Sequence, residues 1–312
     1  MRSMVLLLIF ALLVTVCHHC NAASQVSSLE FNQAIEAAMQ DVVTDASLNT
    51  FVQQLTFFPV PTCNSRVKYP PSSPIPSSLT RLNLCYDGAS YIPPDWIRLY
   101  RMVGQLLVKT LNSKYGLSLQ ENYVLVDTAT EGYFAALSRV VLQGDCDVSV
   151  ADTTVTTERA KTVVFPSCTY GSTSNGFLGT TLDNATLPQF QNVLQLNRSD
   201  VVVAFYGGTV YEEWARQYLS GAVLKAVGYD EQFQLAKNNQ VHAVIGDATD
   251  MYGFLSGNPK NASFVKPFGD PSPYGVFVAR TNVTRSSFAP KALEYKMGWM
   301  VAVVTFWAVL FL

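Results

Sequence analysis

The chain has 312 residues, a formal net charge of −2 and 49% hydrophobic residues. This length allows a large core and one or two domains. Because charge is low and balanced, with no basic block, nucleic acid and anionic membrane surfaces are poor candidates as partners.

Residues 1–23 have the three parts of a secretory signal peptide. Arg2 precedes an apolar run, MVLLLIFALLVTV, and the segment ends in Asn21-Ala22-Ala23. This order predicts export and cleavage after Ala22 or Ala23. A membrane anchor helix is the alternative, but the apolar run is short for one.

Residues 24–58 predict two helices, because apolar residues recur at helical spacing from Leu29 to Leu55. Thr44-Asp45-Ala46-Ser47 breaks the pattern and offers an N-cap for the second helix. Residues 59–78 hold six of the fifteen prolines with several serines, which indicates a linker or an extended surface strap.

Residues 79–170 alternate between strand and helix patterns. LTRLNLCYD, NYVLVD and DVSVAD read as strands, while IRLYRMVGQLLVKTLNSKYG, ended by Gly116, and GYFAALSRVVLQG read as helices. Such alternation predicts a parallel sheet covered on both faces, here called lobe 1.

Lobe 2 is predicted over residues 171–268. It opens with a Ser/Thr/Gly-rich stretch at 171–181, and a second set of strands and helices follows. Its predicted strands are DVVVAFYGGT, AVLKAVG and HAVIGD, alternating with the helices VYEEWARQYLSG, DEQFQLAKNNQ and ATDMYGFLSG. Residues 269–285 contain a return strand, PYGVFVAR. Two such sets predict two lobes with a cleft between them.

Residues 286–312 end in an apolar tail, MGWMVAVVTFWAVLFL, which is marginal for a membrane span. Ser286 and Ser287 supply small residues, and a short polar spacer follows them. This combination indicates replacement of the tail by a glycolipid (GPI) anchor, with a short tail anchor or a buried helix as alternatives. The two ends together predict a protein on the extracellular face of the cell membrane.

Four cysteines remain after signal cleavage: Cys63, Cys85, Cys146 and Cys168. An even number in a secreted chain predicts two disulfides, and the pairs Cys63–Cys85 and Cys146–Cys168 are favoured because each is close in sequence. No CxxC spacing survives, so no metal site is expected. Four N-glycosylation triplets predict surface positions at Asn184, Asn197, Asn261 and Asn282.

The stretch GDCDVSVADTTVTTERAKTVVFPSCTYGSTSNGFL resembles the central motif of the family 3 solute-binding proteins, the amino-acid-type proteins of the periplasmic-binding-protein type II fold. Three more blocks agree in order: LNLCYDGASY, VVVAFYGGTVYEEWA and NNQVHAVIGDATDMYGFL. The resemblance covers about residues 79–280. It implies an α/β fold of two lobes, each an open, mostly parallel sheet flanked by helices, with a hinge between them.

The motif points to a clamp for a carboxylate. Arg159 offers a planar fork of donors that suits a bidentate carboxylate, and Thr154 can add a hydroxyl. Gly208 and Thr209 begin a helix whose free N–H groups favour an anion. A surface arginine and a plain glycine turn are the alternative interpretations.

Other positions follow from the resemblance. Asp247 matches the aspartate that holds the α-ammonium group of the ligand, although it can also be a helix N-cap. Asp87 matches a position that is often acidic, and Tyr86, Tyr91 and Tyr133 are candidates for an aromatic wall or for core positions.

The sequence also departs from the family pattern. Asp152 stands where a small residue is usual, and with Asp87 and Asp247 it would make the cleft acidic apart from Arg159. This favours a basic amino acid or a related amine as the ligand. The first block lacks the usual Pro-Phe and has SYIPPDWIR instead, which leaves the lobe 1 wall open.

A second departure concerns the order of the helices. The family closes with helices that return to the first lobe, whereas this chain reaches the anchor signal soon after PYGVFVAR. Residues 28–59 resemble those closing helices, which we interpret as a circular permutation. An unrelated helical extension is the alternative.

We therefore expect a non-enzymatic solute-binding protein without a cofactor, used in transport or sensing. A membrane transporter or receptor is the expected partner, and any ATP hydrolysis lies in another chain, because no Walker motif is present. A ligand-presenting module for a receptor and a dehydratase-like enzyme are the alternatives. Only His242 remains for histidine-based catalysis after signal cleavage, and it is more readily explained as structural.

Overall fold

The computed structural model describes residues 28–88, 92–182 and 190–280. The predicted signal peptide and anchor signal lie outside these ranges. So do Tyr91, Ser286, Ser287 and the triplets at Asn184 and Asn282. Of the other two triplet positions, Asn197 is exposed and Asn261 is half-buried. Within the described ranges, no helix combines the length and apolar character needed to cross a membrane.

Two helices open the described chain, α2 (Leu29–Val42) and α3 (Ala46–Thr56). Asp45 is the N-cap of α3, and its carboxylate accepts hydrogen bonds from the backbone N–H groups of Ser47 and Leu48, as the sequence predicted. Ile35 of α2 is fully buried and belongs to the same core as helix α4 (Pro94–Tyr115) and strand β1 (Arg81–Asp87). The two helices are therefore part of lobe 1.

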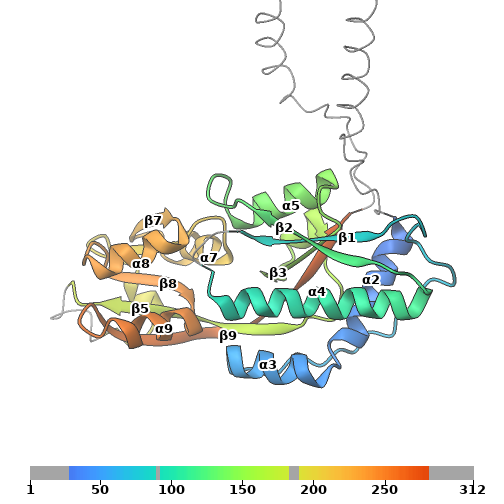
Figure 1. The fold of residues 1–312 in the computed structure, drawn as a ribbon. Coiled ribbons are helices and arrows are strands. Elements are labelled where there is room, and N and C mark those ends of the chain that lie inside the picture. The colour runs from blue at the N-terminus through green and yellow to red at the C-terminus, as the bar shows by residue number, and fades with distance from the viewer. Residues whose placement is uncertain (1–27, 89–91, 183–189, 281–312) are drawn as a thin grey trace, which may run out of the picture. The chain divides into compact units, whose positions relative to one another are not determined.

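The alternating pattern of lobe 1 forms a parallel sheet, as predicted. Its elements are β1 (Arg81–Asp87), α4 (Pro94–Tyr115), β2 (Gln120–Val126), α5 (Tyr133–Gln143) and β3 (Val148–Thr154). Strand β1 pairs in parallel with both β2 and β3. Helices α4 and α5 cover opposite faces of these strands (Figure 1). Gly116 ends α4 in the left-handed conformation, as predicted.

Lobe 2 repeats this arrangement. Its elements are η2 (Val193–Leu196), β6 (Val202–Tyr206), α7 (Val210–Tyr218), β7 (Val223–Val227), α8 (Tyr229–Lys237), β8 (Ala243–Asp247) and α9 (Ala248–Gly257). Strand β6 pairs in parallel with both β7 and β8. The carboxyl ends of these strands carry several of the residues that the sequence analysis singled out.

Two long antiparallel strands, β5 (Gly171–Thr180) and β9 (Ala262–Ala279), join the two parallel sets. The strand order is β2-β1-β3-β9-β5-β8-β6-β7, and the short β4 (Val163–Val164), which follows α6 (Arg159–Thr162), pairs with β9. The described residues thus form one continuous nine-stranded sheet. The two lobes are its two parallel halves.

Strand β5 was missed in the sequence because STSNGFLGT lacks the bulky apolar residues of a typical strand. It is nonetheless mostly buried, between β9 and β8 and beneath α9. A Cβ atom at Gly176 would lie 2.8 Å from the Cα atom of Ala248, so a larger residue would push α9 away. Small residues are required here because other segments approach the strand closely.

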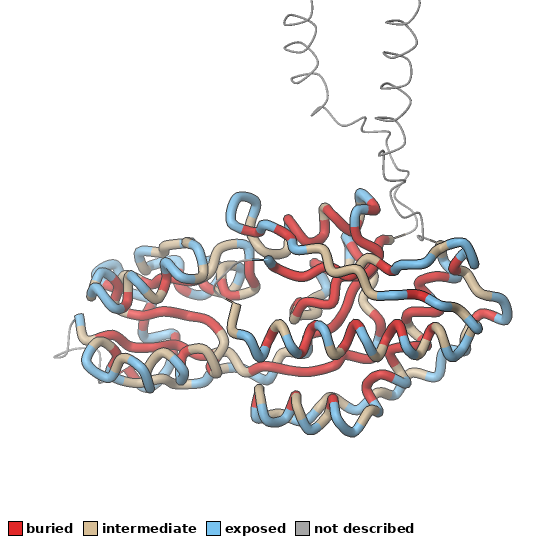
Figure 2. Tube along the Cα trace, in the orientation of Figure 1, coloured by how far each residue is buried: buried red, intermediate tan, exposed pale blue. Residues whose placement is uncertain are grey.

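The buried residues follow the strands and the inner faces of the helices (Figure 2). Lobe 1 has a single core that includes Leu84 of β1 and Leu107 of α4. Lobe 2 has two smaller clusters, one around Phe177 and Phe205 and another around Leu178 and Met251. Each lobe therefore has its own hydrophobic core.

The predicted disulfide pairing is wrong. Cys63 pairs with Cys168, and Cys85 pairs with Cys146, with Cα–Cα distances of 5.0 and 5.9 Å. Cys85 lies on β1 and Cys146 just before the neighbouring β3, so the sheet brings them together although 61 residues separate them. Proximity in sequence was a poor guide because strand order decides which cysteines meet.

The two ends of the described chain lie side by side. The Asn32 side chain at the start of α2 donates a hydrogen bond to the carbonyl of Ala279 at the end of β9, at 3.0 Å. Neighbouring ends are what a circular permutation requires. The permutation itself stays a hypothesis.

Candidate ligand-binding site

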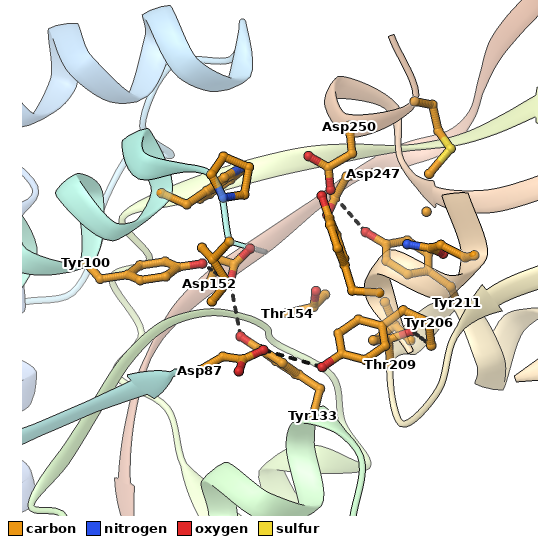
Figure 3. Close-up of a pocket in the computed structure, with 18 of the residues that line it drawn as sticks. Asp87, Tyr100, Tyr133, Asp152, Thr154, Tyr206, Thr209, Tyr211, Asp247 and Asp250 are labelled. Atoms are coloured by element: carbon orange, nitrogen blue, oxygen red, sulfur yellow. Dashed lines mark hydrogen bonds between the residues drawn. The ribbon is translucent and has the colours of Figure 1, made fainter. Parts of the chain in front are cut away.

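A pocket lies where the two lobes meet, and side chains from both lobes line it (Figure 3). Four strand ends reach it, through Asp87 of β1, Thr154 of β3, Tyr206 of β6 and Asp247 of β8. Open α/β sheets commonly place ligands at the carboxyl ends of their parallel strands. The pocket therefore occupies the position that this topology favours.

Arg159 begins α6 and is only 3% exposed. Its Nη1 atom donates to the carbonyl of Thr154 at 3.3 Å, and its guanidinium lies 4.8 Å from the ring centre of Phe134. Among the described residues its Nε and Nη2 atoms have no hydrogen-bond partner, and no carboxylate pairs with it. A buried guanidinium with free donors is costly unless an anion reaches it.

Asp152, the unexpected acid of the sequence motif, lies on the lobe 1 side of the pocket. Its Oδ1 atom accepts hydrogen bonds from the hydroxyls of Tyr100, at 2.6 Å, and Tyr133, at 3.0 Å. Burial raises the pKa of Asp152, while these two hydrogen bonds act in the opposite direction. The tyrosines thus hold this carboxyl in place within the wall.

Asp87 is 3% exposed and is linked to lobe 2 through Tyr206. The Tyr206 hydroxyl lies 3.4 Å from Oδ2 of Asp87 and 2.9 Å from the hydroxyl of Thr128, which follows β2. Asp87 and Thr128 belong to lobe 1, whereas Tyr206 ends β6 of lobe 2. These polar contacts therefore join the two lobes next to the pocket.

Asp247 occupies the N-cap position of α9, but its side chain makes no capping hydrogen bond. Instead its Oδ1 atom accepts from Thr173 and from Tyr211, each at 2.6 Å. Burial and the charge of Asp152 raise the pKa of Asp247 to about 6. The helix-capping alternative therefore does not describe how this carboxyl is used.

Asp250, in the first turn of α9, also lines the pocket. Its carboxyl shares a hydrogen bond with Tyr229 of α8. Burial and the neighbouring charge of Asp247 raise the pKa of Asp250 to about 8. The sequence analysis missed this residue, although its spacing of three from Asp247 places both on one turn of helix.

The start of α7 differs in part from the expectation. Thr209 lines the pocket, followed by Val210 and Tyr211. Gly208 does not line it, and its backbone N–H donates to Glu212 at 2.8 Å. Thr209 and the first turn of α7, rather than the glycine, are thus the part of this segment that lines the pocket.

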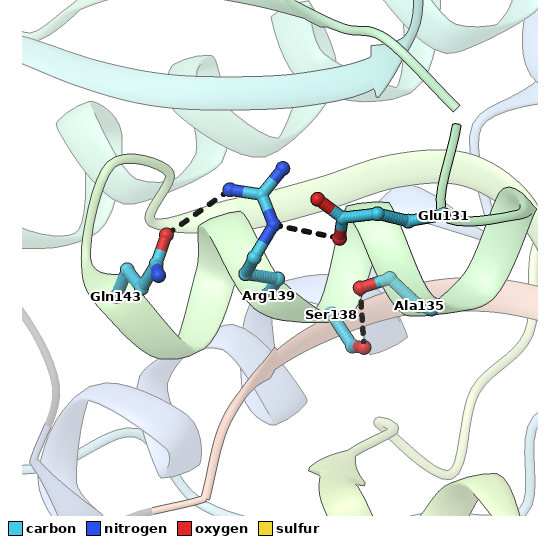
Figure 4. Close-up of polar contacts among 5 residues, drawn as sticks. All are labelled: Glu131, Ala135, Ser138, Arg139 and Gln143. Atoms are coloured by element: carbon cyan, nitrogen blue, oxygen red, sulfur yellow. Dashed lines mark hydrogen bonds and ion pairs between the residues drawn. The ribbon is translucent and has the colours of Figure 1, made fainter. Parts of the chain in front are cut away.

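Gly208 lies against Gly132 of the loop before α5. A Cβ atom at Gly208 would be 2.8 Å from the Cα atom of Gly132, and the backbone N–H of Phe134 donates to the Gly208 carbonyl at 3.4 Å. The same loop is tied to α5 by Arg139, which pairs with Glu131 at 2.8 Å and bonds Gln143 at 3.1 Å (Figure 4).

Apart from the tyrosine candidates, the structure thus brings six residues from the sequence analysis to one pocket: Asp87, Asp152, Thr154, Arg159, Thr209 and Asp247. Of the tyrosine candidates, Tyr133 lines the pocket, whereas Tyr86 packs in the core against Tyr100 and Tyr123. The analysis missed the lining residues Tyr206, Tyr211, Tyr229, Gln232 and Asp250. Tyrosines in helices carry no sequence signal that separates a pocket wall from a core.

His242 is structural in this arrangement. Its Nδ1 atom accepts a hydrogen bond from the backbone N–H of Val202 at 2.9 Å. It does not line the pocket. The described part of the chain contains no cluster of His, Cys, Asp and Glu that would hold a metal ion.

The chain is similar to characterised binding proteins, although no family model matches it. It is 29% identical over 137 residues to the glutamine-binding protein GlnH of an ABC transporter from Bacillus subtilis. This match covers 44% of the chain, which spans about half (48%) of the length of that relative.

Among solved structures, the arginine-bound form of truncated ArgBP from T. maritima aligns with a TM-score of 0.50 at 18% identity, covering 65% of this chain and 90% of that one. The resemblance to family 3 solute-binding proteins is confirmed. The chain has the periplasmic-binding-protein type II fold. An ancestral amino-acid-binding protein, AncCDT-1, described as a precursor of cyclohexadienyl dehydratase, aligns at a TM-score of 0.49 and 19% identity over 72% of this chain and 90% of its own.

Proposed function

We propose that this solute-binding protein holds a small amino-acid-like solute in the pocket between its lobes, and that the lobes close over it. The observation that carries the proposal is Arg159, a buried guanidinium whose Nε and Nη2 atoms have no partner among the described residues. A ligand carboxylate can accept hydrogen bonds from both atoms. The first turn of α7, beginning at Thr209, adds the positive end of a helix dipole on the lobe 2 side.

The acidic side of the pocket supports a ligand that also carries positive charge. Four carboxyls line the pocket with Arg159: Asp87, Asp152, Asp247 and Asp250. The carboxylate of a zwitterionic ligand would pair with Arg159, and its ammonium group would pair with one of the acids. A basic side chain on the ligand would pair with a second acid. We therefore favour a basic amino acid or a related amine. The names of GlnH and of the arginine-bound ArgBP are consistent with an amino acid ligand.

The remaining parts of the proposal concern place and partner. The signal peptide pattern, the anchor pattern and the glycosylation triplets support a protein exposed on the extracellular face of the membrane. There it would deliver its ligand to a transporter or present it to a receptor. The relative GlnH is itself part of an ABC transporter.

A dehydratase-like enzyme is the second candidate. One observation favours it: Asp250 lines the pocket, and burial and the neighbouring charge of Asp247 raise the pKa of its carboxyl to about 8. A protonated carboxyl in a pocket can act as a general acid toward a departing hydroxide. Incubation with prephenate or arogenate tests this directly, since turnover that is lost in Asp250→Asn would establish an enzyme.

The main test is a thermal-shift screen of amino acids and amines on the secreted protein. Arg159→Met keeps the length of the side chain but removes the carboxylate donors. We expect basic amino acids to raise the Tm of the wild type and to leave the Tm of Arg159→Met unchanged. Arg81→Met, at the exposed start of β1, is the control and should respond as the wild type does.

The same variants distinguish binding from folding. Because Arg159 lacks an anionic partner, we expect Arg159→Met without ligand to unfold within about 1 kcal/mol of the wild type, or to be more stable. A large loss of stability without ligand would assign Arg159 a structural role. If basic amino acids raise the Tm of Arg159→Met as much as the Tm of Arg81→Met, the carboxylate clamp is excluded.

A further inference from the structure

The lobe 2 side of the pocket gathers hydrogen-bond acceptors from two helices. Asp247 ends β8, Asp250 lies in the first turn of α9, and Gln232 lines the pocket from α8. Gln232 is only 2% exposed, and within the described ranges its Oε1 atom has no hydrogen-bond partner. Tyr229, one turn before Gln232 on the same face of α8, bonds Asp250.

Within the described ranges, the side chains that donate hydrogen bonds to these two acids are neutral hydroxyls. Thr173 and Tyr211 donate to the same oxygen of Asp247, and Tyr229 bonds Asp250. In the described part of the chain, neither carboxyl forms an ion pair with a basic side chain. The positive end of the α9 dipole offsets only part of the negative charge that these carboxyls carry when they are ionised.

The pocket thus has two neighbouring carboxyls and a buried amide oxygen without a partner among the described residues. These groups favour the binding of a cation that can donate several hydrogen bonds. A primary ammonium carries one positive charge and three N–H donors. We propose that Asp247, Asp250 and Gln232 together bind a primary ammonium group of the ligand. Resemblance to the family implies only Asp247 for such a role, so Asp250 and Gln232 are additional specificity-determining residues.

This inference rests on the proposed function only in that the same pocket holds the solute. It does not need the carboxylate clamp, because the acceptors lie on lobe 2 and Arg159 follows β3 of lobe 1. A diamine without a carboxylate is therefore the appropriate probe. Cadaverine (1,5-diaminopentane) has primary ammonium ends, and its bis-trimethylammonium analogue has the same charges without N–H donors.

The experiment is isothermal titration of the secreted protein with cadaverine, with that analogue and with L-lysine. We expect cadaverine and lysine to bind and the analogue to bind at least tenfold more weakly than cadaverine. Asp250→Asn and Gln232→Met should each weaken cadaverine binding by about tenfold to a hundredfold, the range for a hydrogen bond to a charged group. Asp230→Asn, in the first turn of α8, and Gln234→Met, exposed on α8, are matched controls and should not change affinity.

The outcomes separate this inference from the carboxylate clamp. If cadaverine binds and both pocket variants weaken it, the acceptor group is established even when no amino acid binds. If amino acids bind but both pocket variants keep wild-type affinity, the inference is overturned and the clamp stands. Equal affinity for the trimethylated analogue also overturns it, and an absence of binding by every probe overturns both proposals. Thermal unfolding of each variant checks that it is folded.

Discussion

At the scale of residues, the charges of the pocket are unequally distributed, because four carboxyls share it with the single guanidinium of Arg159. Asp152 is held by two tyrosines and Asp87 lies next to Tyr206, so the lobe 1 acids are anchored by hydroxyls. The ionised carboxylates of Asp247 and Asp250 repel each other. A cationic ligand would relieve this repulsion, which makes its binding sensitive to protonation.

We expect affinity for cadaverine or lysine to rise with pH between about 6 and 8. Asp250 has a pKa of about 8 and Asp247 of about 6, so the empty pocket holds a proton in this range that a cation must displace. One displaced proton changes the dissociation constant by up to about tenfold per pH unit. Titration at several pH values measures this slope, and Asp250→Asn should remove most of it.

The ligand-free protein should show the opposite trend. The pKa of Asp250 is raised from 3.8 in the unfolded chain, so its contribution to stability is fully present below that value and is lost as pH rises toward 8. Besides Asp247, the groups that face it are Tyr229, Tyr211 and Asp152. Urea unfolding at pH 6 and 8 tests this, and a free energy of unfolding that increases with pH would contradict it.

At the scale of elements, the two lobes meet through the turn before α7 and the loop before α5. Gly208 and Gly132 have φ angles of 73° and 85°, in the left-handed region that favours glycine. Their backbones also approach too closely for a side chain on Gly208. The interlobe contact of Tyr206 with Thr128 lies in the same region. These contacts join the lobes beside the pocket, so we expect them to break when the lobes open.

Gly208→Ala should therefore favour an open arrangement. We expect weaker lysine binding, by about tenfold, because ligand affinity falls with the fraction of closed protein. Gly116→Ala is a matched control, since Gly116 has a φ angle of 63° but nothing within 4 Å of an added Cβ atom. Both variants should lose about 1 kcal/mol of stability from backbone strain. Calorimetry and small-angle scattering measure the two effects, and equal affinities in the two variants would argue against the contact as a closing element.

At the scale of the whole molecule, the N-terminal helices complete lobe 1. Ile35, Met39 and Leu48 are fully buried in the core that α4 and β1 share. The Cys63–Cys168 disulfide ties the segment after α3 to the residues after β4, and Glu36 of α2 accepts a hydrogen bond from the backbone N–H of Ser167 at 2.8 Å. These links fasten the N-terminal segment to lobe 1.

Ile35→Ala should lower the free energy of unfolding by about 2–5 kcal/mol, the cost of a cavity in a well-packed core. If α2 were an independent extension, the same change would leave the unfolding of lobe 1 unaffected. Chemical unfolding, followed by the fluorescence of Trp96 in lobe 1, measures the difference. Leu29→Ala, at the exposed first position of α2, is the control and should change stability little.

The sequence by itself determined the local elements and the class of fold. Alternating strand and helix patterns predicted β1 to α5 and β6 to α9, because periodicity and end signals such as Asp45 and Gly116 act over a few residues. The central motif placed Arg159 after a strand, and the block NNQVHAVIGDATDMYGFL placed Asp247 at the end of another. Parallel topology carries strand ends to one edge.

Only the tertiary structure decided which distant residues meet. Strand order set the disulfide pairs, and close packing of β9 and α9 made a strand of the Ser/Thr/Gly-rich segment β5. The packing of lobe 2 placed Gln232 of α8 and Asp250 of α9 in one pocket. Where the lobes meet, Gly208 contacts Gly132 and does not line the pocket. These features depend on contacts between segments far apart along the chain, which local propensity and spacing do not specify.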